Sequence, residues 1–116
     1  MDFSDYNLLK INEFSSMSEK SVKEIFNIYL SEYEDRISKI ETALKRGEEN
    51  DLWEQVHKFK GVLLVFCTEE VVSIAIELDK SLKEKQSDKY EELFYKMKEK
   101  SVAAAEQMKK YLEKAR

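Results

Sequence analysis

The chain has 116 residues, a length that suits one domain and can bury an apolar core without disulfides or a metal. It contains no proline and two glycines, which favours an all-α protein, and its net charge of -4 argues against a basic nucleic-acid-binding surface. The single cysteine, Cys67, excludes an internal disulfide. We therefore expect one helical domain over residues 1–116.

The first expected element is a short helix or a docked, partly helical arm over about residues 5–14. A long amphipathic helix is predicted over about 18–46, because apolar residues recur there every three or four positions. Ser16 and Ser18 are candidate N-caps, and Glu19 stands at capping-box spacing from Ser16.

The helix over 18–46 is expected to end at Gly47, since glycine is the usual C-terminal cap. The same periodicity predicts a helix over about 51–66, with Asn50 or Asp51 as its N-cap.

Thr68 is a candidate N-cap for a helix over about 69–85, and Ser87 or Asp88 for a last helix over about 88–113. Four amphipathic helices joined by short turns bury their apolar stripes most simply as an antiparallel up-down four-helix bundle.

The N-terminal residues lack the cationic start and apolar run of a secretory signal, and the longest apolar run, Val62–Cys67, is far too short to span a bilayer. We expect a cytoplasmic monomer that binds neither membrane nor nucleic acid. Cys67 is expected to be a small, partly buried residue without special reactivity.

The one histidine, His57, is the candidate reactive group. At about 100° per residue it falls about a third of a turn from the core direction of its helix, at the exposed boundary. Lys60 and Gly61 follow at i+3 and i+4, on the same side. An unprotonated imidazole nitrogen can attack a phosphoryl group, and a lysine one turn away offers positive charge to the phosphate.

Gly61 costs about 1 kcal/mol relative to alanine inside a helix, and its missing side chain opens one flank of the imidazole. Trp53, Leu64 and Val65 are expected to form an apolar rim for partner docking. A lone helix histidine is most often a plain surface residue, however, and a helix glycine can instead reflect close packing against a neighbouring helix.

The segment His57-Lys58-Phe59-Lys60-Gly61 resembles the His-x-Leu/Phe-Lys-Gly core of histidine-phosphotransfer (HPt) domains. Upstream, Ala43–Glu48 resembles the closing turn of the family's long second helix. Downstream, Leu78-Asp79 resembles the family's Leu-Glu. The resemblance covers about residues 22–82, and a further helix follows in the expected place.

The resemblance implies that His57 is the phosphorylated residue, Lys60 the neighbouring charge and Gly61 the access glycine. It implies a phosphoryl carrier in two-component phosphorelay signalling, with no ATP-dependent kinase activity and no cofactor or metal of its own. The partners would be receiver domains of response regulators or hybrid kinases, which supply the acceptor aspartate and Mg²⁺.

Two departures from the family pattern leave an alternative open. Val62-Leu63-Leu64 stands where the family has small residues, and Cys67 occupies the place of a second glycine. The chain would then be a non-catalytic helical interaction module that docks a receiver or another partner without carrying phosphate. A di-iron bundle is disfavoured, because the Glu54–His57 pair has no second Glu-x-x-His to match it.

Overall fold

The structure is a computed structural model that describes residues 6–114, so Asp5 of the expected N-terminal element lies outside the described residues. The described chain is helical, with one isolated backbone bridge between Leu9 and Cys67. Its helices, in chain order, are α1 (Ile11–Phe14), α2 (Glu19–Arg46), α3 (Glu49–Phe66), α4 (Glu69–Lys83), the 3-10 turn η2 (Ser87–Lys89) and α5 (Tyr90–Lys114).

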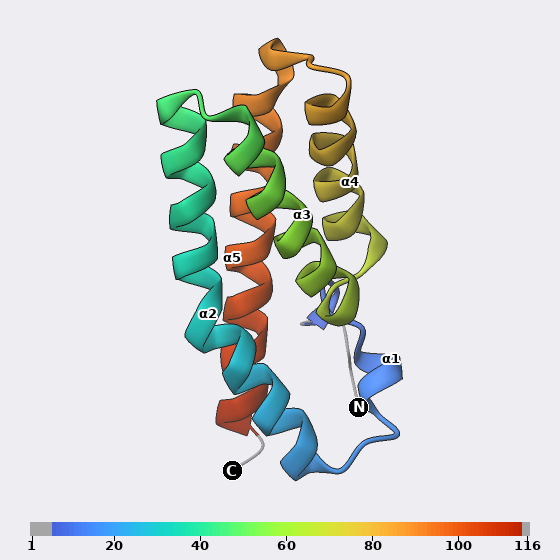
Figure 1. Ribbon diagram of the computed structural model, residues 1–116. Helices are drawn as coiled ribbons and strands as arrows, with labels where there is room; N and C mark the ends of the chain where they lie inside the picture. The colour runs from blue at the N-terminus through green and yellow to red at the C-terminus, as the bar shows by residue number, and fades with distance from the viewer. Residues whose placement is uncertain (1–5, 115–116) are drawn as a thin grey trace.

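The four long helices run alternately up and down, each packed against its neighbours in sequence, and α5 closes the ring against α2 (Figure 1). Helix α3 therefore lies between α2 and α4 and diagonally opposite α5. The fold is the all-α antiparallel up-down four-helix bundle that the sequence predicts. Its core is formed by the apolar stripes of all four helices, with Phe26, Ile40, Phe59, Leu78 and Phe94 fully buried.

The turn between α2 and α3 forms as expected around Gly47, which has a left-handed φ of 68°. Its N–H donates to Leu44 and that of Glu48 to Ala43. Helix α3 then starts at once, because the Glu48 carbonyl already accepts the first helical hydrogen bond from Leu52. Glu48 is the N-cap, so the expectation that α3 begins after Asn50 or Asp51 was wrong.

Two other helix ends have local causes. Of the two candidate N-caps of α2, Ser18 is the one that caps the helix, because its hydroxyl accepts a hydrogen bond from the Ser21 N–H. Helix α4 ends at Lys83, two residues before the expected position, because Lys85 takes a left-handed φ of 55° and turns the chain toward η2.

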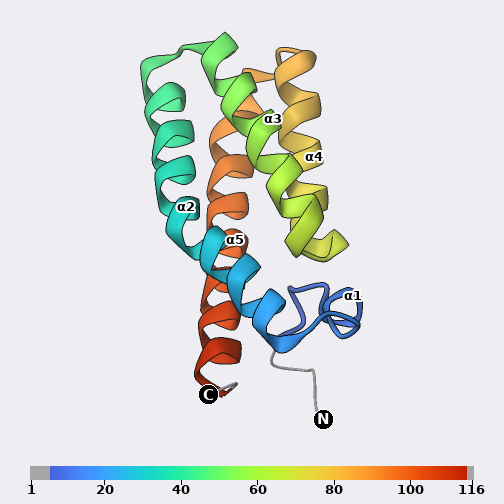
Figure 2. The same ribbon diagram turned by 60° about the horizontal axis from the view of Figure 1, so that its bottom comes forward.

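The N-terminal arm, residues 6–14, fills space that the unequal helices leave open. Helices α2 and α5 have 28 and 25 residues, whereas α3 and α4 have 18 and 15. The arm, which includes α1, lies below the short helices α3 and α4 and beside the ends of the long helices α2 and α5 that extend past them (Figure 2). The apolar side chains of the arm are all buried there: Tyr6, Leu8, Leu9, Ile11 and Phe14.

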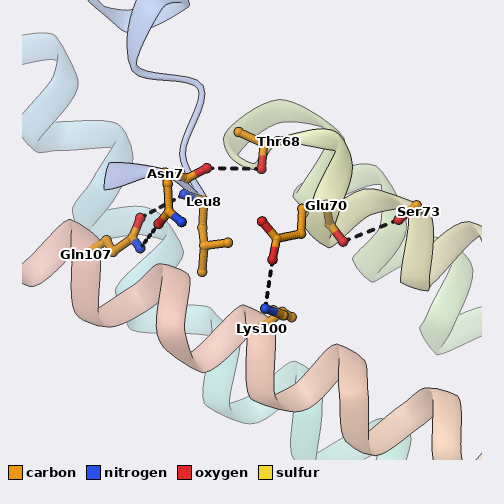
Figure 3. Close-up of polar contacts among 7 residues, drawn as sticks. All are labelled: Asn7, Leu8, Thr68, Glu70, Ser73, Lys100 and Gln107. Carbon is orange, nitrogen blue, oxygen red and sulfur yellow. Dashed lines mark hydrogen bonds and ion pairs between the residues drawn. The ribbon is translucent and has the colours of Figure 1, made fainter. Parts of the chain in front are cut away.

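Backbone hydrogen bonds fix the arm against the turn between α3 and α4. The Lys10 N–H donates to the Phe66 carbonyl and the Thr68 N–H to the Leu8 carbonyl, each at 3.0 Å. Figure 3 shows the other side of this contact, where the Leu8 N–H donates to the side-chain oxygen of Gln107 on α5. The arm thus bonds both to the turn between α3 and α4 and to α5, the last helix of the bundle.

No helix within residues 6–114 is long and apolar enough to cross a membrane.

The two glycines should respond oppositely to alanine. Gly47→Ala should lower the free energy of unfolding by about 1 kcal/mol or more, because a Cβ is strained at its left-handed φ. Gly61→Ala should raise it by about 1 kcal/mol, since alanine is the better helix former and its Cβ would meet nothing within 4 Å. Urea unfolding of both variants checks this; equal signs would contradict it.

Candidate functional site

His57 lies in the middle of α3, on the outer face of the bundle. Val56 and Phe59 beside it are fully buried and anchor the helix, whereas 52% of the imidazole side chain is exposed. The exposure agrees with the boundary position that the helical spacing predicts. Because α3 is fixed by its inner stripe, the imidazole is presented to solvent from a rigid element rather than from a loop.

A buried carboxylate from α4, Asp79, lies beneath this histidine. Its side chain is only 5% exposed, and its Oδ2 accepts a short hydrogen bond from Nζ of Lys60 on α3. The same Oδ2 lies 3.9 Å from Nδ1 of His57 and 3.7 Å from Nζ of Lys83. Asp79 therefore joins α3 to α4 and gathers three basic side chains around one oxygen.

Asp79 is held in its charged form. Burial by itself raises the pKa of this carboxyl group, but the hydrogen bond and the positive charge of Lys60, with smaller contributions from Trp53 and Lys83, outweigh it. The net result is a pKa below the ordinary value for aspartate. A fixed negative charge therefore stands beneath the imidazole at neutral pH.

Trp53, one turn before His57, sets the plane of the imidazole. The two rings stack with centroids 5.0 Å apart and an interplanar angle of 22°. The buried indole N–H favours the charged form of Asp79, although neither Trp53 Nε1 nor Asp79 Oδ1 meets hydrogen-bond geometry within the described chain. Trp53 was expected on the docking rim, and the structure places it half-buried against the ring.

The arrangement distinguishes the two imidazole nitrogens. Nδ1 is the atom near the Asp79 carboxylate, and a negative charge there favours the tautomer that carries its proton on Nδ1. The lone pair is then on Nε2, the other ring nitrogen. A neutral imidazole in this state is a nucleophile.

Gly61, one turn after His57, is exposed and its close surroundings are empty. A Cβ added to it would meet no neighbouring atom within 4 Å. Close packing between helices therefore does not require a glycine here, and that explanation for Gly61 is removed. What the missing side chain leaves is open surface beside the imidazole.

The predicted rim residues Leu64 and Val65 are exposed at 45% and 56%. Two exposed isoleucines that the sequence analysis did not single out lie on the helices that flank α3, Ile28 on α2 and Ile76 on α4. Ile76 stands one turn before Asp79, and Leu64 one turn after Lys60. Since α3 and α4 are antiparallel and joined at the Lys60–Asp79 pair, Ile76 lies opposite Leu64.

Asp79 and Lys83 are the two site residues that the sequence analysis missed as such. A signal for Asp79 exists, because it falls on the inner side of α4, seven residues after the buried Val72. A charged residue at such a position requires a partner. Lys83 carries no comparable signal, since exposed lysines are common along this chain.

Among residues 6–114 there is no group of three or more His, Cys, Asp or Glu side chains placed to hold a metal ion. Comparisons with curated proteins and with solved structures gave no match. The family model of the Hpt domain matches residues 24–116, which include α3, α4 and the whole of the site around His57. The chain therefore belongs to the Hpt domain family, whose role is phosphotransfer in phosphorelay signalling.

Proposed function

We propose that this protein carries a phosphoryl group on Nε2 of His57 and exchanges it with the aspartate of a receiver domain. The observation that supports this most directly is the exposed imidazole whose Nδ1 faces the buried Asp79 carboxylate. Family membership gives the reaction class, and Hpt domains interact with receiver domains. The assignment of roles to individual residues is our proposal.

The transfer step follows from the two ring nitrogens. Nε2 attacks the phosphorus of the receiver's aspartyl phosphate, and a P–N bond forms as the P–O bond to the aspartate breaks. The bonding electrons leave with the aspartate carboxylate, while the imidazole keeps its Nδ1 proton above Asp79. The imidazole becomes positively charged during the attack, so the nearby carboxylate stabilises the product side.

The receiver supplies the remaining groups. It contributes the aspartate and the Mg²⁺ that neutralises the phosphoryl oxygens, whereas this chain contributes the nucleophile, its orientation and local positive charge. The chain is then a carrier without ATP-dependent kinase activity. Four of its exposed apolar side chains, Ile28, Leu64, Val65 and Ile76, form the docking surface for the receiver.

His57→Gln should abolish phosphorylation by receiver domains already phosphorylated on aspartate. Glutamine keeps a polar side chain of similar reach but has no nucleophilic nitrogen. Intact mass should show one added phosphoryl group on the wild type and none on the variant, in the presence of Mg²⁺. If no receiver phosphorylates the wild type although some bind it, the proposed exchange with receivers is refuted and the chain acts toward them as a docking module.

Substitutions at Gly61 should distinguish its role in access to the His57 imidazole from its effect on the stability of the fold. Gly61→Ala should leave phosphotransfer within about threefold of the wild type, whereas Gly61→Leu should slow it at least about tenfold, or about 1.4 kcal/mol in the barrier, because the longer side chain covers the flank of the imidazole. Both should fold, since the site of substitution is open. Equal transfer rates for alanine and leucine would refute the access role.

Val65→Glu should weaken receiver binding about tenfold or more, corresponding to about 1.4 kcal/mol, because it places a charge at the most exposed apolar side chain of the docking surface. Tyr95→Glu is the matched control: Tyr95 is another exposed apolar residue, but it lies on α5, diagonally opposite α3. Titration calorimetry with a receiver measures both. A comparable loss in the control would show that the docking face lies elsewhere.

A further inference from the structure

Two lysines share the Asp79 carboxylate, and they differ in their freedom to leave it. Lys60 comes from α3, its side chain is only 18% exposed, and it donates a direct hydrogen bond to Oδ2. Lys83 comes from the last turn of α4, its side chain is 60% exposed, and its Nζ stays 3.7 Å from the same oxygen. The first contact is a partly buried hydrogen bond, and the second is an ionic contact between an exposed ammonium group and the same buried carboxylate.

Lys60 cannot turn to a new anion without leaving Asp79 behind. The carboxylate is almost completely buried, and a buried charge that loses its hydrogen-bonded partner is strongly destabilising. The other basic groups near Asp79 do not replace this bond, since both His57 and Lys83 lie beyond hydrogen-bond distance. Lys60 is therefore committed to the carboxylate.

Lys83 can move at little cost. The exposed Lys83 ammonium makes no hydrogen bond with the buried carboxylate, so its departure breaks only a 3.7 Å ionic contact, and Asp79 keeps Lys60 when Lys83 leaves. The long flexible side chain starts one turn of α4 beyond Asp79, next to the exposed imidazole. In the resting protein Lys83 is thus held close to His57 by an interaction that it can give up.

We propose, on the basis of the phosphoryl-carrier role proposed above, that Lys83 is the cation that pairs with the phosphoryl group on His57, while Lys60 stays on Asp79. This reverses the expectation from family resemblance, in which Lys60 is the charge next to the phosphate. Lys60 is then a positioning residue that acts through Asp79, and Lys83 determines how long the phosphoryl group persists.

The chemistry of phosphohistidine loss gives the expected direction. In hydrolysis a water oxygen bonds to phosphorus and the P–Nε2 bond breaks. Nε2 keeps the electron pair, Nδ1 keeps its proton, and the protons of the water leave with the phosphate. The transition state is loose and resembles metaphosphate. Metaphosphate carries one negative charge where the bound phosphoryl group carries two, so the negative charge on the phosphoryl oxygens is lower than in the ground state. An ammonium group next to those oxygens therefore stabilises the ground state more and slows hydrolysis.

The test uses chemical phosphorylation, so that no receiver is needed. Phosphoramidate transfers its phosphoryl group to the imidazole and releases ammonia. The wild type, Lys83→Gln, Lys83→Arg and Lys60→Gln are treated in this way, with Lys80→Gln as the matched control, because Lys80 is an exposed lysine on α4 that makes no ion pair with Asp79. Decay is followed by ³¹P NMR and intact mass at neutral pH and low salt.

Lys83→Gln should shorten the half-life of the phosphohistidine at least threefold, and Lys83→Arg should largely restore it. Lys80→Gln should match the wild type. Thermal unfolding separates the two roles: Lys83→Gln should leave the Tm nearly unchanged, whereas Lys60→Gln should lower it clearly, because it removes the partner of a buried carboxylate.

The inference is overturned if Lys83→Gln decays no faster than Lys80→Gln. It is also overturned if a folded Lys60→Gln variant loses its phosphoryl group much faster than Lys83→Gln. A wild type that takes no phosphoryl group on His57 refutes the carrier role itself. A wild type that is phosphorylated chemically but not by any receiver refutes only the proposed exchange with receivers, and the comparison of Lys83 with Lys80 still decides this inference.

Discussion

The buried Asp79 carboxylate, paired with Lys60, is the constraint on which the rest of the site depends. Burial alone opposes ionisation, so Asp79 keeps its charge only because Lys60 reaches it from the neighbouring helix. The pair fixes the register of α3 against α4. It also determines the field at the imidazole, because the same oxygen that accepts from Lys60 faces Nδ1 of His57. One ionic contact thus links packing to reactivity.

The short helices that carry this pair require support from elsewhere in the chain. Helices α3 and α4 cover only part of the length of α2 and α5, and the N-terminal arm covers the remainder. Phe14 from the arm packs edge-on against Phe26 of α2, with ring centroids 5.4 Å apart, and also contacts Phe66 at the end of α3. The arm lies wholly outside the residues that the family model matches, yet it closes the same core.

The sequence predicts the four long helices because their apolar residues follow a period of about 3.6. It places the His57 side chain at the surface for the same reason. It predicts that α2 ends at Gly47 because glycine readily takes the left-handed conformation that ends a helix, which Gly47 does. The predicted start of α3 was wrong because it relied on the residue types that favour an N-cap. Those preferences are weak, and the tight turn of Gly47 and Glu48 determines where the helix begins instead. The position of Asp79 beneath the imidazole depends on how α3 packs against α4, and the spacing of residues within one helix gives no information about that packing.

At Cys67, hydrogen bonds from the arm make unnecessary the glycine that the family resemblance leads us to expect there. A second glycine is expected at this position by resemblance, but Cys67 is extended, with φ of -113°, so no left-handed residue is needed to end α3. The chain can leave the helix extended because the arm pairs with it on either side, at Phe66 and Thr68. The thiol is sealed beneath that pairing, and burial raises its pKa to about 12, which leaves it unreactive. The departure at Cys67 therefore concerns how α3 ends, and the buried thiol forms no part of the exposed surface around His57.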